Sequence, residues 1–236
     1  FILLILCLFI GGSLTLFAWR ASALKQGGLF APISREGALV LNNLLLTVAC
    51  ATVLFGTLYP LALEVLTGIK LSVGAPFFNL TFGPLFMLLL IAVPFGPMLA
   101  WKRGDLLGAA QRLMAAGIAS LIAIALLYAW TYGGSTFAPL AIGLAVFVIG
   151  GALSDLAERM ALFRVPLGVA MARARGLPRS TWGTAFAHAG VGIALIGIVC
   201  ETTWNSEYIG SMKPNDVARV AGYELKLDDV TQRQGP

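Results

Sequence analysis

The stretch WGTAFAHAGVGIALIGIVC, residues 182–200, decides the fold of this chain. It contains no Asp, Glu, Lys or Arg, and as a helix it is nearly long enough to cross a bilayer core of roughly 30 Å. Backbone groups in lipid must find hydrogen-bond partners within the protein, so an apolar run of this length is helical. The stretch therefore predicts a membrane span that contains His188, the only histidine of the chain.

Five further apolar runs have the same character, and together they predict an all-α polytopic membrane protein. The six predicted spans are 1–19, 38–59, 82–100, 113–132, 137–154 and 182–200. The composition agrees, because 58% of the residues are hydrophobic and 11% are charged, whereas a soluble domain has about a quarter charged residues.

The charge distribution predicts how the chain is oriented. Most of the 16 Lys and Arg residues lie in the first, third and fifth connections between the predicted spans. Basic connections remain in the cytoplasm, so the tail after residue 201 is expected on the outer side. The net charge of +5 is then a topology signal. Since no basic run is interleaved with aromatic residues, we do not expect nucleic-acid binding.

Local patterns predict three further features. Ser34 is expected to cap the second helix, with Glu36 in its first turn. The segment PFGP, residues 94–97, is expected to kink or fray the third helix, and such a kink either opens a cavity between helices or, more often, only adjusts their packing. The fifth connection, 155–178, is either an interfacial helix broken at Pro166 or a basic linker.

The tail has a different pattern from the rest of the chain. Residues 217–220 and 222–228 alternate apolar and polar side chains, which predicts two short strands. We therefore divide the chain into a transmembrane helical bundle, 1–201, and an extracytoplasmic segment, 202–236, that begins a small β-domain. Cys7, Cys50 and Cys200 have neither disulfide nor metal-ligand spacing.

Polar residues inside spans are the candidate functional positions, since they are costly in lipid and face the protein interior. Asn42 and Asn43 either bond across a helix interface or contact a ligand. His188 suits an axial metal ligand, a proton relay or a hydrogen-bonded structural residue. Thr184 and Gly192 lie one turn before and after it, and small neighbouring residues leave room for a flat macrocycle or a closely packed helix.

Several segments together resemble the CcmF family, the large membrane subunit of the bacterial System I haem lyase. They run along nearly the whole chain in family order: IGGSLTLFAWR (10–20), SREGALVLNN (34–43), GTLYP (56–60), GAPFFN (74–79), VPFGP (93–97), WGTAFAH (182–188) and VAGYEL (220–225).

The resemblance implies a haem-handling protein of the bacterial cytoplasmic membrane. Such proteins receive haem from the chaperone CcmE and attach it to apocytochrome c presented by CcmH-type partners. They also hold a haem b between two membrane histidines, with quinol as a suggested electron source. His188 matches the second of these histidines and is expected to be a haem b axial ligand, with Thr184, Gly192, Asn42 and Asn43 as candidate contacts. Arg20 and Arg35 could meet the haem propionates, or equally well the phosphates of lipids on the cytoplasmic side.

The chain also departs from the family pattern. The other membrane histidine, two periplasmic histidines and a Trp-rich segment are absent, and we expect them upstream of Phe1. The chain then corresponds to the C-terminal membrane part of a longer protein, cut within the β-domain, and would not act as an enzyme alone. Two alternatives stay open: a transporter or channel subunit with His188 as proton relay, and a structural scaffold.

Overall fold

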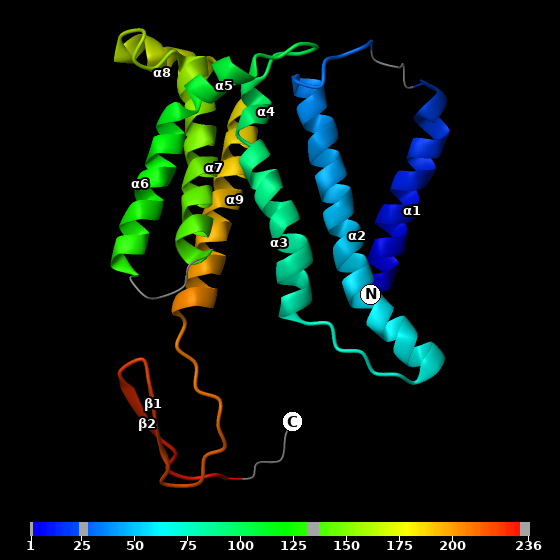
Figure 1. Cartoon of the computed structure of the whole chain (residues 1–236). Helices are drawn as coiled ribbons and strands as arrows, with labels where there is room; N and C mark the ends of the chain where they lie inside the picture. Colours follow the sequence, from blue (N-terminus) through cyan, green and yellow to red (C-terminus); the bar gives the residue numbers. More distant parts are fainter. Residues whose placement is uncertain (1, 24–27, 132–136, 232–236) are drawn as a thin grey trace.

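The computed structural model describes residues 2–23, 28–131 and 137–231. Helices of this region lie side by side, and a two-stranded hairpin extends beyond one end of them (Figure 1). The elements are α1 Ile2–Arg20, η1 Ala21–Ala23, α2 Arg35–Thr67, α3 Ala75–Ala92, α4 Phe95–Met98, α5 Leu106–Arg112, α6 Met114–Trp130, α7 Phe137–Met160, α8 Leu167–Gly176, α9 Arg179–Trp204, β1 Val217–Val220 and β2 Tyr223–Lys226.

The helices confirm the predicted class of polytopic membrane protein. In the described part of the chain, four helical segments are long and apolar enough to cross a membrane: α2, the α3–α4 pair, α7 and α9. The pair α5 and α6, bent by 58°, adds a fifth if it forms one span. A shorter apolar helix over Cys7–Ala23 lies where the sequence predicts the first of six spans.

Several helices run past their predicted ends. α2 continues through Pro60 to Thr67, although the predicted span ends at residue 59, and α7 continues to Met160 rather than to residue 154. Hydropathy indicates which residues lie in lipid, whereas a helix ends where its regular backbone hydrogen bonds end. For α2 that point is Gly68, whose left-handed conformation (φ 73°) lets its N–H donate to the carbonyl of Glu64. The predicted end of the fourth span, Tyr132, lies outside the described residues.

The third span is interrupted at the predicted place. α3 ends at Ala92 and α4 begins at Phe95, on either side of Pro94. Proline has no N–H to donate and its ring crowds the preceding turn, so the regular bonding of the helix is interrupted. The prediction that residues 94–97 break this helix is confirmed.

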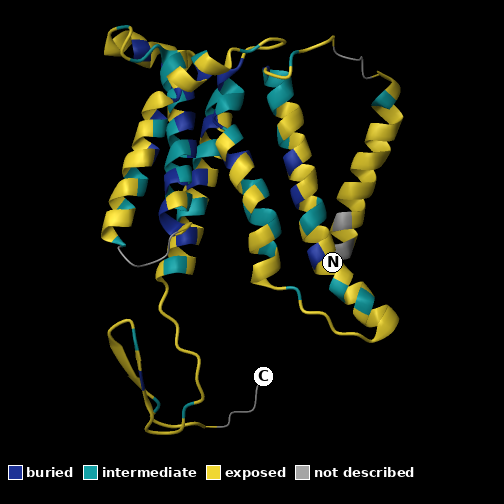
Figure 2. Ribbon diagram, in the orientation of Figure 1, coloured by how far each residue is buried: buried dark blue, intermediate teal, exposed yellow. Residues whose placement is uncertain are grey.

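The core of the bundle is α7, which packs between α6 and α9. Figure 2 shows the buried residues concentrated there. Glycines allow the close approach: an added Cβ at Gly150 would lie 2.8 Å from the Cβ of Ala116 on α6. Ser120 of α6 also donates a hydrogen bond of 2.6 Å to the carbonyl of Gly143. Small residues with occasional polar bonds are typical of helix packing in membranes.

The fifth connection contains a helix, α8. This agrees with the first of its two predictions, a helix interrupted at Pro166, and not with the second, a basic linker. α8 begins directly after Pro166, which stands at its N-terminal cap. Ala170 and Ala174 are buried, and the indole N–H of Trp182 donates to the carbonyl of Ala174 at 3.3 Å. α8 is thereby attached to the beginning of α9.

The predicted strands of the tail form an antiparallel hairpin. Val217 pairs with Lys226 and Val220 with Tyr223. The two turn residues, Ala221 (φ 50°) and Gly222 (φ 82°), both have positive φ, as a tight two-residue hairpin turn requires. The three cysteines are free, as expected.

Candidate cofactor site

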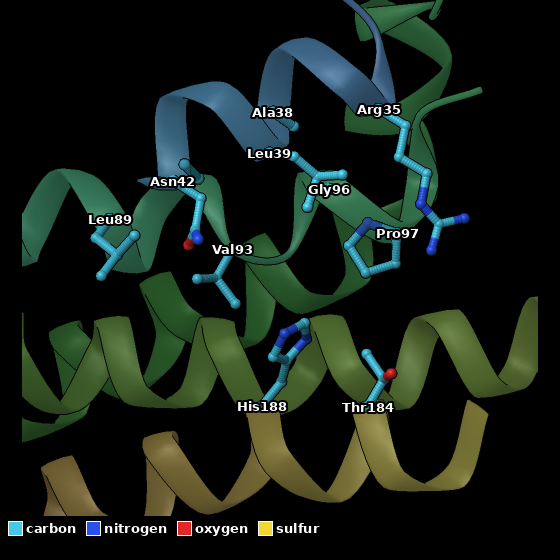
Figure 3. Close-up of a pocket in the computed structure, with 11 residues that line it drawn as sticks. Arg35, Ala38, Leu39, Asn42, Leu89, Val93, Gly96, Pro97, Thr184 and His188 are labelled. Atoms are coloured by element: carbon cyan, nitrogen blue, oxygen red, sulfur yellow. The ribbon is translucent and has the colours of Figure 1, made fainter. Parts of the chain in front are cut away.

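His188 lines a cavity between three parts of the bundle. The cavity has a volume of about 310 Å³ and lies among the beginning of α2, the α3–α4 break and the first half of α9 (Figure 3). It is lined by Arg35, Ala38, Leu39, Asn42, Leu89, Ala92, Val93, Gly96, Pro97, Thr184 and His188. The break at Pro94 supplies one wall through Val93, Gly96 and Pro97. Of the two outcomes considered for this break, a cavity or an adjustment of packing alone, the structure shows the cavity.

The lining has a simple chemical character. Most of it is apolar, and its polar members are one guanidinium, one imidazole, one amide and one hydroxyl. None of the acidic residues in the described ranges lines it. A cavity of this kind suits an apolar ligand that offers an electron-pair acceptor to His188 and a negative group to Arg35.

The rotation of α9 decides which neighbours of His188 reach the cavity. At 3.6 residues per turn, Thr184 and Gly192 lie about 40° to either side of His188. Thr184 lines the cavity. Gly192 instead faces α7, where an added Cβ would lie 2.9 Å from the carbonyl oxygen of Ala145. The structure thus places Gly192 in a helix interface, away from the cavity where it was expected to contact a cofactor.

The two asparagines also separate. Asn42 lines the cavity, whereas Asn43 is exposed on another face of α2. Their amides bond each other at 3.4 Å, with Asn42 as the donor. Adjacent residues on a helix point about 100° apart, so only Asn42 reaches the cavity. In place of the expected hydrogen bond across a helix interface, the structure has this bond within α2.

His188 has no partner set for a multi-residue metal site. In the described ranges, no group of three or more His, Cys, Asp or Glu residues could hold a metal ion. Haem iron needs only axial ligands from the protein, and a histidine imidazole is a common one. The imidazole can ligate the iron, the apolar walls can hold the porphyrin ring and the cation can meet its propionates, so the residues fit a haem.

The comparison with known proteins covers the whole chain. All 236 residues align with the cytochrome c-type biogenesis protein CycK of Bradyrhizobium diazoefficiens at 76% identity, over 36% of that relative. They also align with the CcmF proteins of Pseudomonas aeruginosa at 40% identity and of Escherichia coli at 32%, over 35% of each relative. The chain belongs to the CcmF/CycK family. It spans about a third of the length of these relatives. No family model and no solved structure matches it.

Family membership confirms the resemblance found in the sequence, but the structure adds a residue that the sequence pattern did not indicate. Asp155, expected at the start of a connection, lies inside α7 and is 7% exposed. Arg159, one turn later, donates to it at 2.9 Å. The four-residue spacing of Asp155 and Arg159 places them on one face of a helix, and in the sequence this spacing indicates that the helix continues past residue 154.

Proposed function

We propose that this chain is the haem-holding membrane part of a cytochrome c haem lyase, and that His188 is an axial ligand to a haem b in the cavity. One observation carries the proposal: the only histidine of the chain lines the cavity, instead of facing lipid or packing against α7. A ligand role would account for an ionisable side chain within a membrane span.

The haem would supply one-electron chemistry, and the protein would bind it, orient it and limit water access. The imidazole of His188 would provide one ligand nitrogen and keep a proton on the other. Leu89 and Val93 form the apolar wall opposite α9 (Figure 3), and burial against such a wall tunes the potential of a haem. The second axial ligand would come from outside these 236 residues, since the chain has only one histidine.

The other roles proposed for the chain follow from the family. The basic connections would lie in the cytoplasm and the hairpin in the periplasm, where the haem chaperone CcmE, CcmH-type subunits and apocytochrome c would meet the protein. Quinol is the proposed electron donor. Lipid would surround the exposed apolar faces of the helices.

The alternative, a transporter with His188 as proton relay, has less support. A relay needs polar groups that continue across the membrane. The polar residues of this cavity come from the first turns of α2 and the first half of α9, all near the end of the bundle with the basic connections. Beyond them, a second cavity among α3, α6, α7 and α9 is lined almost wholly by apolar residues.

The test is the visible spectrum of the full-length protein with His188→Gly, with Thr57→Ala as a control outside the cavity, since the Thr57 hydroxyl donates to the carbonyl of Val53 within α2. We expect the wild type and the control to show the same Soret band. The glycine variant should lose the band or shift it, and added imidazole should restore it by entering the vacated space. A wild-type spectrum in the glycine variant, without imidazole, would exclude His188 as a ligand.

A further inference from the structure

Among the described residues, Arg35 is the only cation that lines the cavity of His188. We propose that Arg35 binds the propionate carboxylates of the haem and so fixes which edge of the macrocycle faces the basic-connection end of the bundle. This inference rests on the proposed function, because it concerns the same site. In Figure 3 the Arg35 side chain extends alongside Pro97 toward the α9 side of the cavity, where Thr184 and His188 lie.

The charge of Arg35 has no carboxylate partner in the described part of the chain. None of the ion pairs of that part includes Arg35. The neighbouring carboxylate, Glu36, accepts the backbone N–H of Lys102 at 2.7 Å. Arg35 is also the first residue of α2, where the helix dipole adds positive potential. This end of the cavity therefore favours a negative group.

The guanidinium is held in place before any ligand arrives. It lies over the ring of Trp101, with its Cζ 5.1 Å from the ring centroid. Two backbone hydrogen bonds join the segments that contain Arg35 and Trp101. The N–H of Arg35 donates to the carbonyl of Ala100 at 3.0 Å, and the N–H of Gly104 donates to the carbonyl of Ile33 at 2.7 Å. A cation fixed in this way loses little conformational entropy when a carboxylate binds.

The chain contains a matched cation that lacks the cavity. Arg20 also lies over a tryptophan, with its Cζ 5.6 Å from the ring centroid of Trp19. Trp19 is 75% exposed, and α1 stands apart from the helices that enclose the cavity (Figure 1). Of the two arginines that the sequence offered as propionate partners, the structure therefore favours Arg35.

The experiment compares haem b with its dimethyl ester, in which both propionates are neutral. The full-length protein is placed in zwitterionic lipid nanodiscs, and each porphyrin is titrated while the Soret band is followed. The proteins are the wild type, Arg35→Gln, Arg35→Lys and the control Arg20→Gln. A charge-assisted hydrogen bond predicts that the wild type and the control bind the acid roughly tenfold more tightly than the ester.

Arg35→Gln should bind the ester as the wild type does, which shows that it is folded, and should lose the preference for the acid. Arg35→Lys should keep part of that preference. Equal affinities of the wild type for acid and ester, or a preference unchanged in Arg35→Gln, would overturn the assignment of Arg35; the second result would also be expected if Arg35 binds only lipid phosphate. No Soret band that depends on His188, with either porphyrin, would overturn the proposed function and this assignment together.

Discussion

Gly192 of α9 lies against Ile149 of α7 so closely that an added Cβ would be 2.6 Å from Cγ1 of Ile149. On this side α9 packs closely on α7, and in this rotation His188, four residues earlier, lines the cavity. Gly192, which has no functional group, thus helps to determine where the imidazole of His188 points.

Gly192→Ala is expected to lower the free energy of unfolding by about 1–3 kcal/mol, because a methyl group in a closely packed interface forces helices apart. Thermal unfolding of the purified protein in detergent measures this, and the haem content should fall with it. Gly190→Ala is the control, since an added Cβ there meets nothing within 4 Å. Equal effects of the two substitutions would contradict the proposed role of the contact.

Val93→Phe is expected to reduce haem occupancy without lowering stability. In Figure 3, Val93 points into the cavity toward His188, so a larger ring would fill the space beside the imidazole. Haem content per polypeptide, together with the melting temperature, checks this. Leu88→Phe serves as the comparison, because Leu88 is 56% exposed on α3, the helix that ends just before Val93. The prediction fails if Val93→Phe retains full occupancy.

Arg159→Gln should destabilise α7 by about 1–3 kcal/mol, because it leaves the buried carboxylate of Asp155 without its ionic partner. The exposed pair between Arg164 and Glu158, at 3.0 Å, offers the matched case. Arg164→Gln should change stability by less than about 0.5 kcal/mol, since surface pairs contribute little. Denaturation of both variants under the same conditions distinguishes the two sites.

Ser34→Ala should lower the free energy of unfolding by about 1 kcal/mol and make the position of Arg35 less fixed. The Ser34 hydroxyl, fully buried, accepts the N–H of Gly37 at 3.0 Å and caps α2. Thermal unfolding gives the stability, and proteolysis of the 31–37 segment reports the loosening. Ser13→Ala, which removes only a bond within exposed α1, should be neutral. An unchanged cleavage rate in Ser34→Ala would contradict the prediction that the cap holds Arg35 in place.

Features set by a few consecutive residues could be predicted. The cap at Ser34 and the break at Pro94 each follow from the properties of one side chain. The extension of α7 to Met160 was missed, because the hydropathy drop at Asp155 resembles the end of a span. The ion pair with Arg159 keeps that turn helical.

The sequence by itself determined that residues 182–200 form a membrane helix containing His188, since apolar length and backbone hydrogen bonding are local properties. Only the tertiary structure decided that Thr184 and His188 face the cavity and that Gly192 faces α7. The physical reason is that α9 is apolar on all sides and lipid is as apolar as a protein core. Hydrophobicity therefore cannot orient this helix, and contacts with residues distant in the sequence must do so.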